Sequence, residues 1–235
     1  MIDIHSHILP GVDDGAADLD ASVELVRELA SAGVTDIIAT PHYVDETNYV
    51  STVSANSKIL KKLSARLKKE KLDVRVFLGN EIYISNRILG LLTSEEITSL
   101  ADSKYLLVEL PLSGEFPSYY DVFLELIREG YKVILAHPER YATFQKDFEL
   151  AVELYDMGVL LQCNAGSFIG HYGKAARKLA EKLAKNDMIF AVATDIHHPR
   201  GSKFMDAAFK RLSKFYGTFE LEDILEKNPR KILGV

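Results

Sequence analysis

Apolar residues cluster into short runs along this chain, at residues 2–5, 34–40, 74–79, 105–109, 131–136, 159–163 and 188–194. Most of these runs are continuous and do not alternate apolar with polar positions. A strand with this pattern is buried on both faces, as in a parallel sheet covered by helices. The pattern therefore predicts seven buried strands.

The segments between the runs have helical periodicity, and three of them end in a glycine that directly precedes a strand, at Gly33, Gly130 and Gly158. Glycine past a helix end adopts the left-handed conformation without a steric penalty, so each marks a helix stop. The pair Asn186-Asp187 takes the same place before the last strand. Strands that alternate with helices predict either an α/β barrel or a doubly wound sheet.

Two further helical segments are predicted from local sequence. Residues 51–71 form a long, strongly basic stretch that reads as a solvated outer helix. Residues 93–96, with the sequence Thr-Ser-Glu-Glu, have the form of a capping box that opens another helix.

Length and composition bound the class of protein. With 235 residues and 47% hydrophobic content the chain can bury one substantial core, which predicts a single domain over residues 1–235. The N-terminus has no secretory signal pattern, and no stretch reaches the roughly 20 apolar residues of a membrane span. We therefore expect a cytoplasmic protein without membrane insertion. A net charge of −6 makes nucleic acid a poor candidate partner.

Metal-ligand side chains stand at or just after the ends of the predicted strands. A parallel barrel gathers the C-terminal ends of its strands at one face, where active sites are built. Spacing by two in an extended segment also puts two side chains on the same side, as in His5-Ser6-His7 and Asp195-Ile196-His197. The residues expected to converge are His5, His7, His42, Glu81, Glu109, His137, Asn164, Asp195 and His197.

Taken singly, each residue also has an ordinary structural explanation. His42 and His137, for example, could be core histidines with satisfied hydrogen bonds. The joint pattern favours a metal site. Cys163 is the only cysteine, so the ligands must be nitrogen and oxygen atoms. Mixed imidazole and carboxylate ligands suit manganese, with iron or zinc as alternatives, and so many ligands indicate more than one ion.

Five segments match the motifs of a known family in the same order and at suitable separations. The chain resembles the phosphatases of the CpsB/CapC group within the polymerase and histidinol phosphatase (PHP) superfamily. These are bacterial protein-tyrosine phosphatases associated with capsular and exopolysaccharide synthesis. The matching segments are residues 3–15, 40–42, 79–81, 137–141 and 194–197.

The resemblance implies a distorted (β/α)7 TIM-like barrel that holds three divalent metal ions. The implied ligands are His5, His7, Glu81 and Asp195 for the first ion, Glu81, Glu109 and His137 for the second, and Asp14, His42 and His197 for the third. Glu81 would bridge two ions. The family pattern favours Asp14 over its neighbour Asp13, and either residue could instead be an ordinary turn residue before Gly15.

The expected reaction is hydrolysis of phosphotyrosine by a metal-activated hydroxide, without a covalent enzyme intermediate. Cysteine-based phosphatases carry an arginine six positions after the nucleophile, and here that position, after Cys163, is Ile169. Cys163 is therefore expected to be a buried strand residue. Tyrosinate leaves readily because the pKa of a phenol is about 10, so strong acid assistance is not essential.

Two arginines are predicted to bind the phosphate. Arg140 lies three residues after His137, and Arg200 lies three residues after His197, so both should overhang the metal face. Their planar guanidinium groups suit bidentate phosphate binding, with a surface salt bridge as the ordinary alternative. Nearby residues are undecided between roles at the site and bystander or packing roles: His171, His198, Phe116, Tyr119, Tyr120, Tyr141 and Phe168.

The resemblance implies that the substrate is the tyrosine-rich tail of a membrane-associated bacterial tyrosine kinase. The nearest alternative is a PHP phosphatase for a small metabolite such as histidinol phosphate. A second alternative is a catalytically inert metal-binding regulator, and phosphodiester hydrolysis is a third. The sequence leaves the oligomeric state open.

Overall fold

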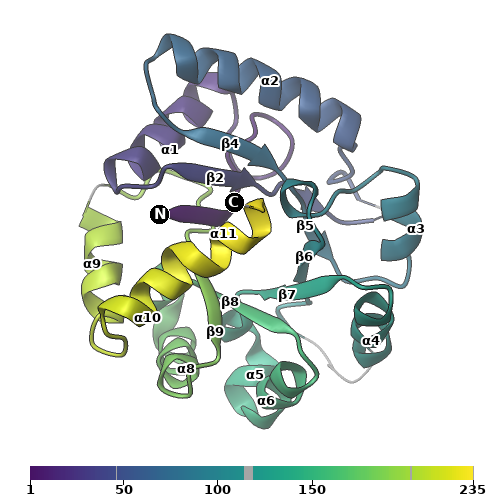
Figure 1. Ribbon diagram of the computed structural model, residues 1–235, viewed down its shortest axis with the longest axis vertical. Helices are drawn as coiled ribbons and strands as arrows, with labels where there is room; N and C mark the ends of the chain where they lie inside the picture. The colour runs from purple at the N-terminus through teal and green to yellow at the C-terminus, as the bar shows by residue number, and fades with distance from the viewer. Residues whose placement is uncertain (46, 114–118, 202, 235) are drawn as a thin grey trace.

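Parallel strands form two sheets that together make a distorted barrel (Figure 1). The computed structural model describes residues 1–45, 47–113, 119–201 and 203–234. In this part of the chain the smaller sheet has the order β1-β2-β4 and the larger sheet the order β3-β5-β6-β7-β8-β9. The strands are β1 (Ile2–Ser6), β2 (Asp36–Ala39), β3 (His42–Tyr43), β4 (Arg75–Leu78), β5 (Glu81–Tyr83), β6 (Tyr105–Glu109), β7 (Lys132–Ala136), β8 (Leu160–Asn164) and β9 (Ile189–Ala193).

The seven predicted strands are confirmed to within two residues at either end. Two short strands, β3 and β5, were not predicted, because Pro41 interrupts the apolar run before β3 and Gly79-Asn80 the run before β5. At both places the chain passes from the small sheet into the large one. Glu81 therefore opens β5, where the sequence suggested that it follows the end of a strand.

The first and last strands meet and bring the two sheets together. The amide of Asp195 donates to the carbonyl of His5 at 2.9 Å, and the amide of His7 donates to the carbonyl of Ile196 at 3.0 Å. Ser6 and Ile196 form a parallel bridge at the same place. Two of the segments that carry predicted metal ligands, residues 5–7 and residues 195–197, are thus joined by backbone hydrogen bonds. The predicted α/β barrel is confirmed.

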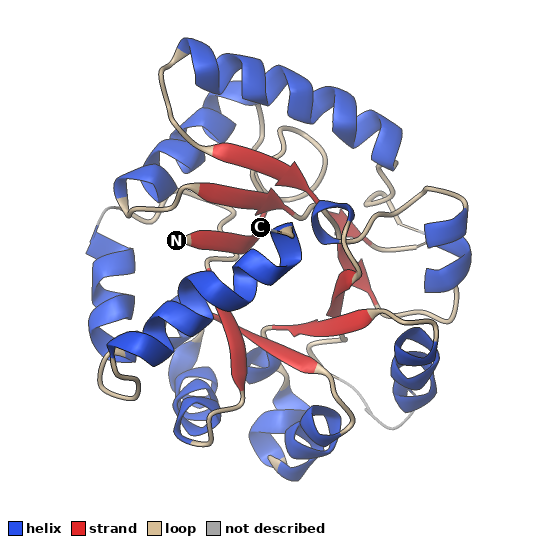
Figure 2. Cartoon of the chain, in the orientation of Figure 1, coloured by secondary structure: helices blue, strands red, loops and turns tan. Residues whose placement is uncertain are grey.

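Helices surround the strands (Figure 2). The α-helices are α1 (Leu19–Ser31), α2 (Val53–Lys69), α3 (Ile88–Thr93), α4 (Tyr120–Arg128), α5 (Ala142–Lys146), α6 (Glu149–Asp156), α7 (Ala165–Phe168), α8 (Gly173–Lys185), α9 (Lys203–Leu212), α10 (Thr218–Glu222) and α11 (Asn228–Leu233). Helix α11 crosses one end of the barrel in Figure 1, where buried Ile232 packs in one cluster with Ile2, Ile4 and Ile134. This apolar packing closes one end of the barrel, and the polar residues lie at the opposite end of the strands.

The helix ends follow the predicted chemistry with one exception. Gly33, Gly130 and Gly158 have φ angles of +87°, +84° and +97°. In the pair Asn186-Asp187 it is Asp187 that takes the left-handed conformation, with a φ of +53°, while Asn186 has a φ of −99°. The predicted helix start at residues 93–96 is wrong, because α3 ends there and the hydroxyl of Thr93 donates to the carbonyl of Leu89 at 2.8 Å. A threonine that bonds back to the preceding turn caps nothing ahead of it.

The basic stretch predicted at residues 51–71 is confirmed as the outer helix α2, with Leu63 and Leu67 buried and its lysines exposed. Its N-cap is Thr52, whose hydroxyl accepts from the amide of Ala55 at 3.3 Å. Of the helices that the structure describes, none combines the length and the apolar content needed to cross a membrane.

Candidate metal centre

The nine residues predicted as metal ligands lie together at the C-terminal ends of the strands. His5 and His7 come from β1 and the residue after it, His42 opens β3, Glu81 opens β5 and Glu109 ends β6. The other four lie in loops: Asp14 after β1, His137 after β7, and Asp195 and His197 after β9. Overlapping sets of these side chains have possible ligand atoms within 4.8 Å of one another.

Four buried side chains enclose one point at the centre of this cluster. The Nε2 atoms of His5 and His7 are 3.2 Å apart, and they lie 3.1 Å and 3.2 Å from Oε2 of Glu81. Oδ1 of Asp195 lies 3.5 Å from both nitrogens. Ligand atoms bound at about 2.0–2.2 Å to one ion are about 3.0–3.5 Å apart, so these distances fit a coordinated cation.

Hydrogen bonds behind the imidazoles orient their lone pairs toward that point. Nδ1 of His5 lies 2.9 Å from Oε1 of Gln162, and Nδ1 of His7 lies 2.7 Å from Oδ2 of Asp13. Because each oxygen accepts the Nδ1 proton, each neutral ring presents an unprotonated Nε2 to the cluster. Oε2 of Glu81 is buried there without a hydrogen-bond donor, and so is Oδ1 of Asp195. Lone pairs that face lone pairs require a cation between them.

Protons fill this role in the metal-free protein. Burial lowers the pKa of His5, but the carboxylates of Glu81 and Asp195 outweigh it and raise that pKa to about 9. Burial and the charge of Glu81 raise the pKa of Glu109 to about 7. A metal ion must displace these protons, so proton release accompanies metal binding.

Metal affinity is therefore expected to rise with pH. The His5 proton alone predicts about a tenfold gain in apparent manganese affinity from pH 7 to pH 8, and the added Glu109 proton predicts a combined gain of about 50-fold from pH 6 to pH 7. Titration calorimetry in two buffers of different ionisation enthalpy measures both the affinity and the protons released. An affinity that does not change between pH 6 and pH 8 would contradict this account.

Glu81 faces two groups of partners at once. Its Oε2 points to His5 and His7 and also lies 3.0 Å from Nδ1 of His42, while its Oε1 lies 2.9 Å from Nε2 of His137. Glu109 borders the same side, with Oε1 3.7 Å from Nε2 of His137 and Oε2 3.8 Å from Nδ1 of His42. The two oxygens of one carboxylate can thus serve two neighbouring cations.

Backbone strain aims two of these side chains inward. His137 has a φ of +34° and Asp195 a φ of +50°, both in the left-handed region. For residues other than glycine this conformation costs of the order of 1 kcal/mol and persists where the surroundings enforce it. Both residues lie in the first turn after a strand, where a sharp change of direction turns the side chain over the barrel.

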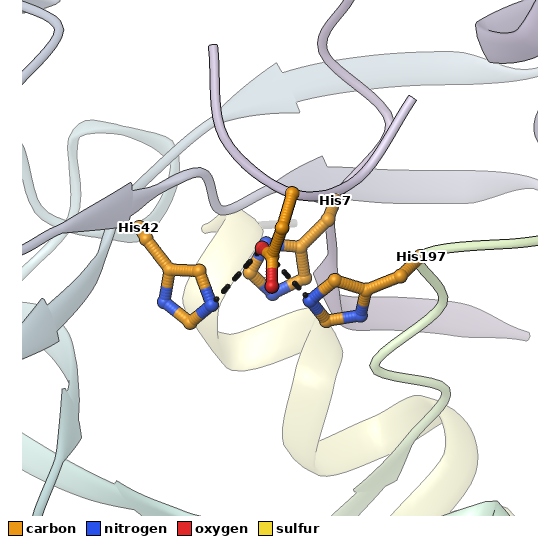
Figure 3. A group of neighbouring side chains, drawn as sticks. His7, His42 and His197 are labelled. Carbon is orange, nitrogen blue, oxygen red and sulfur yellow. Dashed lines mark ion pairs between the residues drawn. The ribbon is translucent and has the colours of Figure 1, made fainter. Parts of the chain in front are cut away.

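A third group lies toward the solvent. Figure 3 shows His42 and His197 facing one carboxylate, with His7 behind them. The carboxylate is that of Asp14, whose Oδ1 lies 3.5 Å from Nε2 of His42 and 3.4 Å from Nε2 of His197. A hydrogen bond from His197 lowers the pKa of Asp14 to about 2, so this carboxylate is ionised at neutral pH.

The two neighbouring aspartates have different partners. Asp13 is committed to structural hydrogen bonds, since its Oδ2 accepts from His7 and from the amide of His42 at 3.1 Å, and its Oδ1 accepts from the amide of Gly15 at 3.0 Å. The Asp14 side chain is 53% exposed and faces the cluster. The geometry therefore makes Asp14 the better candidate ligand and Asp13 a positioning residue.

The loop that carries both aspartates packs closely on β1. A Cβ atom on Gly15 would lie 2.1 Å from the carbonyl oxygen of His7, closer than any real contact. We expect Gly15→Ala to displace Asp13 and Asp14, to weaken metal binding at the outer group, and to lower turnover by about 10- to 100-fold. The matched control is Gly90→Ala, because that position has no atom within 4 Å of an added Cβ. Equal metal content and turnover in both variants, measured by elemental analysis and rate assay, would contradict the prediction.

A cavity of about 410 Å³ opens over the cluster. Arg140 is among the described residues that line it, and its Nη1 donates to Oδ2 of Asp195 at 2.9 Å. Arg200 is not among them. Its Nη2 donates to the carbonyl of Asp195 and to the hydroxyl of Tyr172, both at 3.0 Å. The centroid of the Tyr172 ring lies 4.7 Å from the guanidinium carbon of Arg140 and 5.7 Å from that of Arg200.

Three residues of the site were not identified from the sequence: Gln162, Tyr172 and, as a positioning residue, Asp13. Gln162 is a fully buried amide in an otherwise apolar strand, and it donates to Asn164 at 2.8 Å while it orients His5. Asn164, which the sequence did indicate, donates in turn to Oδ2 of Asp195 at 2.7 Å. A lone glutamine inside a buried strand was the signal that could have revealed this support.

The other described residues singled out in the sequence are buried in the core or lie away from the cavity lining. Cys163 is completely buried, and burial raises the pKa of its thiol, as expected for a strand residue without a nucleophilic role. Tyr141 and Phe168 are buried packing residues, and the Tyr141 hydroxyl donates to the carbonyl of Ala136 at 2.8 Å. Among the other undecided residues, Tyr119, Tyr120, His171 and His198 do not line the cavity in the described part of the chain, and Phe116 lies outside the described residues.

Comparison with known proteins gives a consistent picture. The family described as "Capsular polysaccharide synthesis, CpsB/CapC" matches residues 1–234. CapC of Staphylococcus aureus is 35% identical over 237 residues, an alignment that covers 99% of this chain and 91% of CapC. The tyrosine-protein phosphatase YwqE of Bacillus subtilis is 34% identical over 235 residues, with 99% of this chain and 91% of YwqE covered.

A solved structure supports the same relation. It comes from a study of YwqE from Bacillus subtilis and CpsB from Streptococcus pneumoniae, described as unique metal-dependent tyrosine phosphatases. The match has a TM-score of 0.88 at 33% sequence identity and covers 100% of this chain and 94% of that chain.

Proposed function

The chain belongs to the CpsB/CapC family, and on that premise we propose that it is a metal-dependent protein-tyrosine phosphatase. The observation that carries the proposal is the buried cluster of His5, His7, Glu81 and Asp195, whose lone pairs converge without donors between them. Such a cluster needs a metal ion or imidazole protons between its ligand atoms, because buried carboxylates without partners are costly.

The proposed site holds three divalent ions, with the ligand sets that the family resemblance implies. They are His5, His7, Glu81 and Asp195 for one ion, Glu81, Glu109 and His137 for a second, and Asp14, His42 and His197 for a third. We propose manganese as the native metal, since carboxylate and imidazole ligands without thiolate suit it.

Bound divalent ions supply Lewis acidity toward phosphate oxygens and lower the pKa of a water molecule toward neutrality. The protein itself supplies position and charge. Asp195 holds Nη1 of Arg140 at 2.9 Å, and the ring of Tyr172 supports the same guanidinium from its face. Arg140 is thereby fixed at the cavity wall with further donors free to grip phosphate oxygens. We propose that Arg200 assists indirectly, through its hydrogen bond to the hydroxyl of Tyr172.

Departure of the leaving group needs little help from the protein. A phenol has a pKa of about 10, so tyrosinate departs without a strong general acid. Histidinol phosphate would leave as an alkoxide of much higher basicity, which makes it the more demanding substrate. This difference and the relatives named above favour phosphotyrosine over the metabolite alternative.

A substrate panel tests the proposal. Manganese-loaded protein should hydrolyse a phosphotyrosine peptide with a kcat/KM at least about 100-fold above that for histidinol phosphate, and should leave single-stranded DNA intact. A preference for histidinol phosphate would assign the chain to metabolism. Failure to hydrolyse any of the three would favour an inert regulatory role.

Cys163→Ala is expected to keep full turnover of the phosphotyrosine peptide. The thiol is buried and its pKa is raised, so it does not supply a thiolate at neutral pH. The variant should lose stability by about 1 kcal/mol through the small cavity it leaves, which thermal unfolding measures. Loss of turnover with unchanged metal content and unchanged fold would show that the thiol takes part in the reaction.

The substrate protein and the pathway are inferred from the family. Its description links it to capsular polysaccharide synthesis, and we propose the tail of a bacterial tyrosine kinase in that pathway as the substrate protein. We further propose a cytoplasmic location. Residues 1–235 would act as one domain, because the ligands come from both sheets and from loops at both ends of the sequence.

A further inference from the structure

The walls of the cavity over the cluster differ sharply in chemistry. One part carries the charged and imidazole groups, including Arg140. The rest of the described lining consists of four residues that bear no charge and offer mainly apolar or aromatic surface: Val44, Tyr49, Tyr83 and Leu112. None of these four is a metal ligand in the sets above, so the function proposed so far gives them no role.

The four residues come from neighbouring parts of the larger sheet. Val44 and Tyr49 follow β3, Tyr83 ends β5, and Leu112 lies shortly after β6. These three strands are adjacent in the order β3-β5-β6, so the residues border one side of the cavity mouth. Leu112 is 42% exposed, and the carbonyl of Leu112 accepts from the amide of Ala142 at 3.1 Å, which anchors this segment beside the Arg140 turn.

Tyr49 is held in place by a local turn. The amide of Val44 donates to the carbonyl of Tyr49 at 2.8 Å, and the amide of Tyr49 donates to the hydroxyl of Thr47 at 3.1 Å. The Tyr49 ring stacks on the imidazole of His42, with centroids 5.8 Å apart and an interplanar angle of 29°. An aromatic face is thus fixed directly beside a candidate metal ligand.

A ligand that uses both walls must carry a phosphate and a ring. Aromatic rings that bury against other rings gain area-dependent stabilisation and prefer centroid separations of about 4.5–7 Å. An alkyl phosphate or inorganic phosphate reaches only the charged wall. A cavity of about 410 Å³ has room for a phosphate group together with a phenyl ring.

We propose that Val44, Tyr49, Tyr83 and Leu112 form a slot for the ring of an aryl phosphate, with Tyr49 as the main specificity-determining residue. This inference rests on the proposed phosphatase function and deepens it. The charged wall binds any phosphate monoester, and the slot selects phosphotyrosine over phosphoserine. The same slot admits small aryl phosphates that have no peptide attached.

Two phosphonates that resist hydrolysis separate the slot from the metal centre. Phenylphosphonate and methylphosphonate share one dianionic head group and differ in the ring. Their affinities for manganese-loaded protein are measured by titration calorimetry in the wild type, Tyr49→Phe, Tyr49→Ala and the control Tyr155→Ala, which removes a tyrosine that is 42% exposed on α6. Metal content is measured for each variant.

The wild type should bind phenylphosphonate at least about tenfold more tightly than methylphosphonate. Tyr49→Ala should reduce this ratio by about 3- to 10-fold and change methylphosphonate affinity by less than about twofold. Tyr49→Phe and Tyr155→Ala should keep the wild-type ratio. Equal affinities in the wild type, or an equal loss of both ligands in Tyr49→Ala, would overturn the slot and leave the phosphatase proposal standing. Failure of both phosphonates to bind the wild type would overturn the slot and the phosphatase proposal together.

Discussion

Replacing Glu81 with glutamine is expected to lower the turnover of a phosphotyrosine peptide by at least about 10³-fold, because metal-ion catalysis supplies several kcal/mol of transition-state stabilisation. Glu81 is completely buried, and its two oxygens contact imidazoles of different ligand groups. The amide keeps the size of the side chain but replaces an anionic ligand atom by a donor. Two ions would lose their shared ligand together.

The matched control is Glu125→Gln, which makes the same exchange at an exposed position on α4. The measurement pairs the turnover rate with metal content by elemental analysis and with thermal unfolding. The metal-free variant should be less stable than the metal-free wild type near neutral pH, because it removes the buried carboxylate that pairs with the protonated His5. Wild-type turnover, or normal metal content with reduced turnover, would contradict a bridging role for Glu81.

Arg140→Ala should lower kcat/KM for the same peptide by about 10²- to 10³-fold while the metal content stays close to that of the wild type. The guanidinium is charged and largely buried at the cavity wall, so its loss leaves the phosphate with one fewer donor in a partly desolvated place. Arg140→Lys should recover little, because a point charge does not reproduce a planar pair of donors.

Arg140 also pairs with Asp195, so the metal content decides between two explanations. A loss of bound metal would show that Arg140 acts through Asp195. Loss of inorganic phosphate affinity at full metal content would show a direct contact with the phosphate. Arg128→Ala, at an exposed position on α4, is the control and should leave both properties unchanged.

Much of the fold could be predicted from the sequence, because the strands are buried on both faces. Continuous apolar runs and glycines after helices placed the seven main strands to within two residues. The sequence also predicted that the candidate ligands lie together, since ligand types recur at the strand ends and a parallel barrel brings those ends together. The resemblance to the CpsB/CapC group then divided the same residues among three ions. In the structure their neighbour groups overlap and divide the residues differently, so this division stays a prediction.

Other features of the fold depend on tertiary contacts and could not be predicted from the sequence. The strands β3 and β5 are too short for a periodic signal, and only the sheet order shows that the chain changes sheets at Pro41 and Gly79. The four residues 93–96 look like a helix start, but α3 already occupies that place and ends there. Local propensity has no information about the neighbours that override it.

The supporting residues were the hardest to foresee. Asp13 and Asp14 are adjacent and chemically identical. The family pattern favoured Asp14 as the ligand, but the positioning role of Asp13 became visible only where the loop packs it against His7. Gln162 is distant in sequence from His5, which it orients. The direction of Arg200 depends on Tyr172, which no motif marked.

The central claim is that a cluster of divalent ions held by these side chains hydrolyses phosphotyrosine. The most direct test removes the metal with a chelator, dialyses the chelator away, and follows peptide turnover while manganese is added back. The stripped protein should show no turnover, and turnover should recover and reach a plateau as three ions per chain are bound. Full turnover by protein shown to be free of metal would contradict the account.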